Sequence, residues 1–234
     1  MNPATQLAQS LIATGAIGRV LSARVLSTTV AFGPKVEEAM AFGEDAGNGV
    51  TLITIQGAHT LDFAVAVLGE FADLSALTTI QFPELEIGDA ARKQKRSVPD
   101  HLLTQSALVN GSALSVEVAG GRPADATPFR LEVTGDKGQL TLDGGAIRGF
   151  QSGLLALSLN GKPEQVADTR AEHLPGTAVN VAGVYAALRD DITANTFTVP
   201  DFHHAVRLTR LIDDLLSSAA SGARKQASEW PRQK

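Results

Sequence analysis

The sequence predicts an α+β domain in which helices pack on one face of an open, predominantly antiparallel sheet. Helical patterns open and close the chain, short alternating strands fill its middle, and the turns between those strands are too short for parallel crossovers. The other sheet face would lack a cover, for which a partner subunit is a natural candidate. We expect residues 1–222 to form one domain and residues 223–234 a polar, disordered tail.

The chain begins with a predicted helix. Asn2 followed by Pro3 fits an N-cap with proline at the first helical position, and Gly15 suits the end of the helix. Residues 19–32 are rich in β-branched side chains and alternate well enough for a long strand. Residues 33–48 contain proline and glycines and are interpreted as an irregular excursion.

Strands are predicted again from 71 to about 83, and repeatedly between 102 and 160, where apolar and polar residues alternate. Asn110-Gly111 is a strong hairpin turn signal, and residues 135–138 form a second one. Turns of this length indicate antiparallel neighbours.

Two helices are predicted near the end of the chain. The first runs from Val179 to about Ile192. The second follows Pro200, with Asp201 placed to cap it, and stops near Gly222.

The composition excludes several classes of protein. A formal net charge of −5 argues against a nucleic-acid binder, and the absence of cysteine excludes disulfides and thiolate chemistry. No run of apolar residues approaches the roughly 20 that a membrane helix needs, and no secretion signal opens the chain. We therefore expect no membrane association and a cytoplasmic location.

The segment from Gly47 to Phe71 carries the strongest functional signal. His59 is the candidate general acid/base, because imidazole exchanges a proton near neutral pH; the alternative is a satisfied histidine in a mostly apolar helix. Gln56 and Asp62 each lie three residues from His59 and are predicted to contact substrate. Asp62 is also a candidate to orient the imidazole, with a surface or capping carboxylate as the alternative.

Two residues close to His59, Ile55 and Gly57, bear on this interpretation. If the helix reaches back to Val50, Ile55 lies one turn before His59 on the same face. Gly57 weakens the helix by about 1 kcal/mol, which indicates that something approaches the backbone closely there.

Four motifs, taken in order, resemble the C-terminal domain of Gfo/Idh/MocA oxidoreductases. They are LIATGAIGRVLSARV at 11–25, GAHTLD at 57–62, FRLEVTGDKGQLTL at 129–142 and DFHHAVRLTRLIDDLLSSAASG at 201–222. Together they span nearly the whole chain. The variant TLITIQGAHTLDF is most similar to the galactose-regulator-like branch of that family.

The resemblance implies the substrate-binding and oligomerising half of an NAD(P)-dependent sugar or polyol oxidoreductase. It implies a substrate-side acid/base role for His59, a sugar or polyol ligand, and a homodimer or larger homo-oligomer formed through the sheet. Many family members carry an aspartate where this chain has Ile55, which weakens the catalytic reading. The alternative is a non-catalytic regulatory or scaffold protein that uses the sheet as an interface.

The cofactor half of such an enzyme is not expected within this sequence. It contains neither a Gly-x-Gly-x-x-Gly turn in a strand–turn–helix context nor the Glu-Lys-Pro motif that supplies the family's lysine. We therefore expect the chain alone to be inactive, whether it is a fragment or a natural single-domain protein.

Three further candidates are weaker. A metal at His203-His204 is disfavoured, because adjacent helical residues point about 100° apart. The basic run 92–96 is interpreted as a solvated loop, with a cofactor phosphate from another domain as the alternative. A stand-alone sugar-binding module is disfavoured because aromatic platforms are scarce: Tyr185 is the only tyrosine and Trp230 the only tryptophan.

Overall fold

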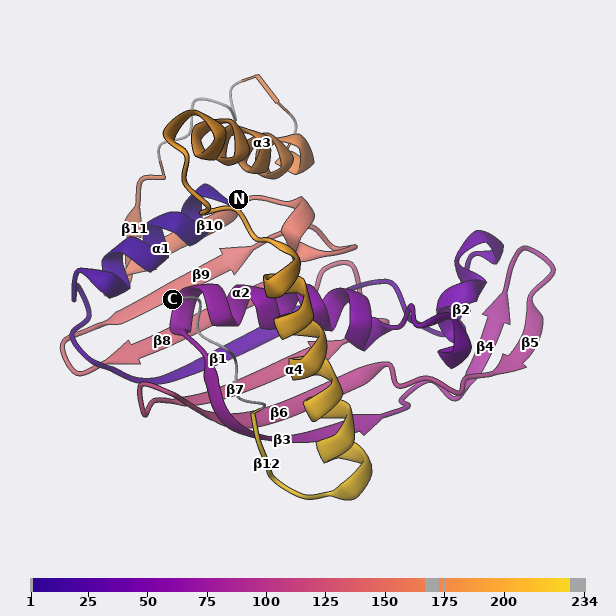
Figure 1. Cartoon of the computed structure of the whole chain (residues 1–234). Helices are drawn as coiled ribbons and strands as arrows, with labels where there is room; N and C mark the ends of the chain where they lie inside the picture. Colours follow the sequence, from indigo (N-terminus) through magenta and orange to yellow (C-terminus); the bar gives the residue numbers. More distant parts are fainter. Residues whose placement is uncertain (1, 167–172, 175, 228–234) are drawn as a thin grey trace.

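A nine-stranded sheet forms the body of the fold, and a small three-stranded sheet projects from one end (Figure 1). The computed structural model describes residues 2–166, 173–174 and 176–227. In spatial order, the strands of the large sheet are β11 (Lys162–Glu164), β10 (Leu155–Leu159), β9 (Gln139–Gly144), β8 (Phe129–Gly135), β1 (Val20–Thr28), β7 (Ala113–Ala119), β6 (His101–Leu108), β3 (Phe71–Thr79) and β12 (Lys225–Gln226). All neighbours are antiparallel except β1 and β7. The predicted sheet type is confirmed.

Helices α1 (Pro3–Ala13), α2 (Ala58–Leu68) and α4 (Phe202–Ser221) cover one face of the large sheet, whereas α3 (Gly176–Ala194) lies at its periphery (Figure 1). Strand side chains alternate accordingly. Leu102 of β6 is buried under the helices, whereas its neighbour Leu103 is exposed on the opposite face. Helices on one face only are what the sequence predicted.

An aromatic cluster lies at the centre of the core. Phe63 of α2 meets Phe129 of β8 edge to face, with ring centroids 4.8 Å apart. Phe129 stacks in turn on Phe150, at 4.2 Å, from the short helix η4 (Phe150–Ser152). The cluster therefore joins the helical layer to the sheet.

The predicted helix caps and turns are confirmed. The Asn2 side chain accepts a hydrogen bond from the Ala4 amide at 3.0 Å, and Asp201 accepts one from the His204 amide at 2.8 Å. Gly222 ends α4 in the left-handed region, with φ +68°. The turn at Asn110 joins β6 to β7 as an antiparallel hairpin.

The small sheet was not predicted. It consists of β2 (Lys35–Val36), β4 (Glu84–Ile87) and β5 (Arg92–Lys95). The 3₁₀ turns η1 (Glu38–Glu44) and η2 (Ala46–Asn48) complete the excursion between residues 33 and 48.

The interpretation of residues 92–96 as a solvated loop is partly wrong. Residues 92–95 are mostly exposed, as expected, but they form β5 rather than a loop, and the Arg96 side chain is fully buried. Its guanidinium binds both carboxylate oxygens of Glu44, at 2.7 and 2.8 Å, Asp100 at 2.6 Å and the Gly33 carbonyl at 2.9 Å. One carboxylate from a distant segment, Glu44, and one from four residues away, Asp100, therefore compensate a charge that the sequence pattern places in solvent.

The prediction of a disordered tail is wrong for its first residues. Lys225 and Gln226 form β12, which pairs with β3, and Arg224 makes an ion pair with Asp73 at 2.5 Å. Residues 228–234 lie outside the described residues.

One segment of the described chain, Ala46–Leu68, is long and apolar enough to cross a membrane by length and composition. The expectation that no such stretch exists is therefore corrected. Half of its most apolar window is buried inside the fold, as in the core helix of a folded domain, so the segment is weak evidence for a membrane span.

Candidate functional site

The segment carrying His59 is a helix with a widened first part. A π-helical turn, η3 (Ile53–Gly57), leads directly into α2. The Thr54 hydroxyl donates to the Gly49 carbonyl at 2.8 Å and ties the start of this turn to the preceding loop. A π turn places one more residue in the turn than an α-helix does, so side chains on either side of it point in different directions; such turns are frequent at functional sites.

His59 lies on the accessible side of α2. Partial burial of the ring lowers its pKa below 6.5, and the charge of Asp62 acts in the opposite direction. The imidazole is therefore mainly neutral at pH 7 and able to accept a proton. Ile55, four residues earlier in the π turn, is also exposed.

Gln56 points away from the accessible side of the helix. Its side chain is buried, and its amide nitrogen donates to the Ser27 hydroxyl of β1 at 2.8 Å. The Thr60 hydroxyl donates to the Gln56 carbonyl at 2.7 Å. Gln56 thus braces the helix against the sheet, and a direct contact with substrate stays a prediction.

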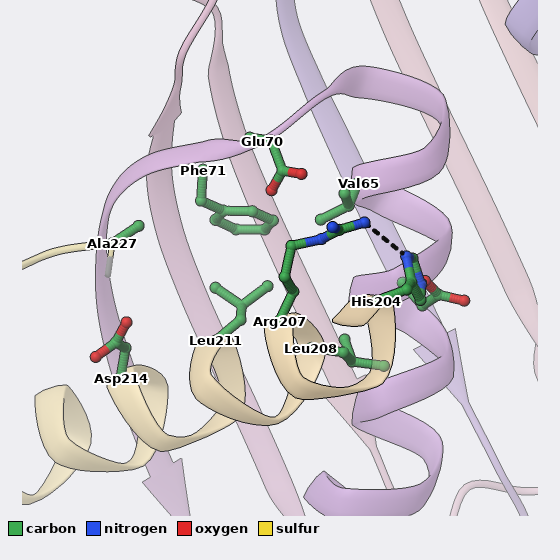
Figure 2. Close-up of a pocket in the computed structure, with 10 residues that line it drawn as sticks. Val65, Glu70, Phe71, His204, Arg207, Leu208, Leu211, Asp214 and Ala227 are labelled. Carbon is green, nitrogen blue, oxygen red and sulfur yellow. Dashed lines mark hydrogen bonds and ion pairs between the residues drawn. The ribbon is translucent and has the colours of Figure 1, made fainter. Parts of the chain in front are cut away.

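Asp62 binds a residue that sequence spacing could not indicate. Its Oδ1 atom lies 2.5 Å from Nε2 of His204, in the first turn of α4. Arg207, one turn further along α4, lies with Nη2 3.4 Å from Nδ1 of His204 (Figure 2). Asp62 therefore joins α2 to α4 by a direct bond, while it acts on His59 through space.

A small hollow lies beside this pair (Figure 2). It has a volume of about 20 Å³, enough for roughly one ordered water molecule and too small for a sugar. Its lining residues are Asp62, Val65, Glu70, Phe71, His204, Arg207, Leu208, Leu211, Asp214 and Ala227. The hollow lies between α4 and the end of α2.

The described residues do not fit a metal or a dinucleotide. No group of three or more histidine, aspartate or glutamate side chains in the described part of the chain converges on one point. A dinucleotide site needs a strand, a glycine-rich turn and a helix in a parallel sheet, but β1 is followed by β2 and the 3₁₀ turns.

The chain matches the family model described as "Gal80p, C-terminal domain" over residues 3–144. It is 29% identical over 225 residues to the dehydrogenase aclE of Aspergillus oryzae, which covers 92% of this chain and 58% of that protein. It is 30% identical over 149 residues to the galactose/lactose metabolism regulatory protein GAL80 of Saccharomyces cerevisiae, which covers 59% of this chain and 34% of that protein. The chain is thus considerably shorter than both relatives.

Solved structures share the fold. A super-repressor mutant of Gal80p from Saccharomyces cerevisiae superposes with a TM-score of 0.83 at 25% identity, covering 96% of this chain and 62% of that one. Levoglucosan dehydrogenase in complex with NADH and L-sorbose superposes with a TM-score of 0.77 at 18% identity, covering 97% and 63%. At this identity, the second likeness concerns the fold alone.

Proposed function

The chain belongs to the Gal80p C-terminal-domain family, of the Gfo/Idh/MocA type, and from this premise we propose that it is the substrate-binding and oligomerising half of an NAD(P)-dependent sugar or polyol oxidoreductase. The observation that carries the proposal is His59, an accessible imidazole whose lowered pKa leaves it neutral at pH 7. A neutral imidazole can take the proton of a substrate hydroxyl as that carbon is oxidised. The likeness to a relative named a dehydrogenase supports this reaction class.

Nicotinamide chemistry would have to come from a domain outside this chain, because the described residues do not fit a dinucleotide site. Exposed apolar side chains around the connection from α3 to α4 offer such a domain a place to pack. Phe197 is 94% exposed and Phe202 90% exposed, and Tyr185 and Ile192 of α3 are also largely accessible. Large apolar side chains this exposed are typical of an interface.

The loop that carries Phe197 is held in a defined shape. Asp191 of α3 accepts hydrogen bonds from the amides of Thr198 and Val199, at 2.8 and 2.9 Å, and from the hydroxyl of Thr196 at 2.7 Å. A surface that is ordered before its partner arrives loses less entropy on docking. The same surface would serve a protein partner in the regulatory reading.

The acid/base role is tested by fusing the chain to the part of the Aspergillus oryzae dehydrogenase that it does not match, and assaying a panel of sugars and polyols with NAD⁺ and NADP⁺. His59→Ala is expected to lower turnover by about 10²- to 10⁴-fold, the usual contribution of a general base. His203→Ala is the matched control, because it removes an exposed imidazole from α4. Unchanged turnover in His59→Ala would remove His59 from the mechanism.

The alternative is a regulatory or scaffold protein without chemistry. Ile55 favours it, because no carboxylate stands one turn before His59. The likeness to GAL80, a regulatory protein, favours it too. A fused enzyme that oxidises none of the panel, although its fold is intact, would support this reading.

For assembly, we propose that the helix-free face of the large sheet forms a homodimer. Leu77 of β3 and Leu103 of β6 are cross-strand partners on that face, and both are exposed. Sedimentation equilibrium is expected to give a dimer for the chain and a monomer for Leu103→Arg. Leu154→Arg, a change at an exposed leucine outside the strands, is the control. A wild-type chain that stays monomeric at high concentration would contradict the proposal.

For location, we expect a cytoplasmic protein.

A further inference from the structure

His204 occupies a fixed position over α2. Its own helix is anchored by Leu211, Ile212 and Leu215, all buried in the core. Asp201 caps the same helix by accepting the His204 amide hydrogen. The position of the imidazole beside the Asp62 carboxylate is therefore set by a helix that is packed into the core.

The partners of His204 define which ring nitrogen carries the proton. A guanidinium can only donate, so the contact from Arg207 Nη2 makes Nδ1 of His204 the acceptor. Nε2 then bears the hydrogen and donates it to Asp62 Oδ1. A hydrogen bond from a histidine ring nitrogen to a carboxylate oxygen therefore joins α4 to α2.

Asp62 thus stands between two imidazoles. It is bonded to His204, and its charge favours the protonated form of His59 one turn earlier on α2. The other charged groups on this side are Glu70, before β3, and Arg207 and Asp214, on α4; all three line the adjoining hollow. Of these, Arg207 contacts His204 directly, at 3.4 Å from Nη2 to Nδ1, so a substitution at His204 removes this contact together with the bond to Asp62.

We propose that His204 is a positioning residue for His59: by holding the Asp62 carboxylate on α4, it keeps His59 neutral and ready to accept a proton. The inference rests on the acid/base role proposed for His59. Without His204, Asp62 is free to turn along its own helix toward His59, where a closer negative charge stabilises the imidazolium. The imidazole would then be more fully protonated near pH 7 and a poorer base.

The test is an NMR titration of the His59 ring in the chain itself, with the signal assigned by its loss in His59→Gln. His204→Ala is expected to raise the pKa of His59 by about half a unit, as a carboxylate moving a few ångströms closer in a solvated setting would do. Asp62→Asn is expected to lower it. His204→Gln, whose side-chain amide can still donate to Asp62, is expected to keep the wild-type value.

The double variant separates an action through Asp62 from a general loosening of α4. In the Asp62→Asn background, His204→Ala is expected to leave the pKa of His59 unchanged. An equal shift in both backgrounds, or no shift in either, would overturn the inference. If His204→Ala disturbs the helix, as judged by circular dichroism, then His204→Asn gives the same test, because its amide is too short to reach Asp62. Turnover of the fused His59→Ala enzyme tests the proposed function separately, so the two failures are distinguishable.

Discussion

Replacing Arg96 by methionine is expected to lower the free energy of unfolding by about 3–5 kcal/mol, the usual loss when one partner of a buried ion pair is removed. The side chains of Arg96, Glu44 and Asp100 are respectively 0%, 2% and 1% exposed. Methionine fills much of the same volume but removes the positive charge. Two buried carboxylates then remain without their cation, although Asp100 keeps hydrogen bonds from the amides of Gln81 and Phe82.

Urea unfolding followed by circular dichroism measures this loss. Arg92→Met is the matched control, because the ion pair between Arg92 and Glu38 has side chains 53% and 67% exposed and is expected to contribute at most about 1 kcal/mol. Adding Glu44→Gln to Arg96→Met should restore part of the loss, since it removes one uncompensated charge. Equal destabilisation by Arg96→Met and Arg92→Met would refute the reasoning.

Three other predictions concern the helices. The hydrogen bond from the Val199 amide is the main cause that lowers the pKa of Asp191 from 3.8 to about 2. Asp191 therefore stabilises its loop fully above pH 3.8, and this stabilisation is lost as the pH falls through 2. The NMR signal of the Val199 amide should shift over the same range, and a signal that stays constant from about pH 5 to about pH 1.5 would contradict the prediction. Gly57→Ala should raise the free energy of unfolding by about 0.5–1 kcal/mol in urea titrations, because Gly57 has helical backbone angles and an added Cβ would meet Ile53 at an ordinary 3.5 Å. A lower free energy of unfolding would instead indicate that another group approaches the backbone closely at Gly57, as the sequence suggested. Phe63→Ala should lower it by about 3–5 kcal/mol by opening a cavity beside Phe129, and a calorimetric loss below about 1 kcal/mol would count against that packing.

Much of the fold could be predicted because its signals are local. Asn2 and Asp201 cap their helices through atoms two or three residues away, so sequence proximity alone brings the partners together. The turn at Asn110 sets the pairing of β6 with β7 in the same way. The small sheet was missed because β2 and β4 are separated by a long stretch of chain and each is short.

The candidate site likewise contains features that the sequence predicted and features that only the structure shows. The position of His59 on a helix followed from residue spacing and from family motifs. The direction of Gln56 did not, because the π turn alters which side chains point outward, and this turn is visible only in the backbone. No spacing rule would have found His204 as the partner of Asp62, which lies 142 residues away.

The sequence by itself determined the fold class, most helix and strand positions and the family, since periodicity, caps and turns act over a few residues. Only the tertiary structure decided which charges are buried and which polar side chains meet. Arg96 belongs to a run that looks solvated, yet a carboxylate 52 residues away and another four residues away enclose it. Asp62 likewise acquires its partner from another helix. Such pairings depend on how separate elements pack in space, and burial, which follows from that packing, sets their strength.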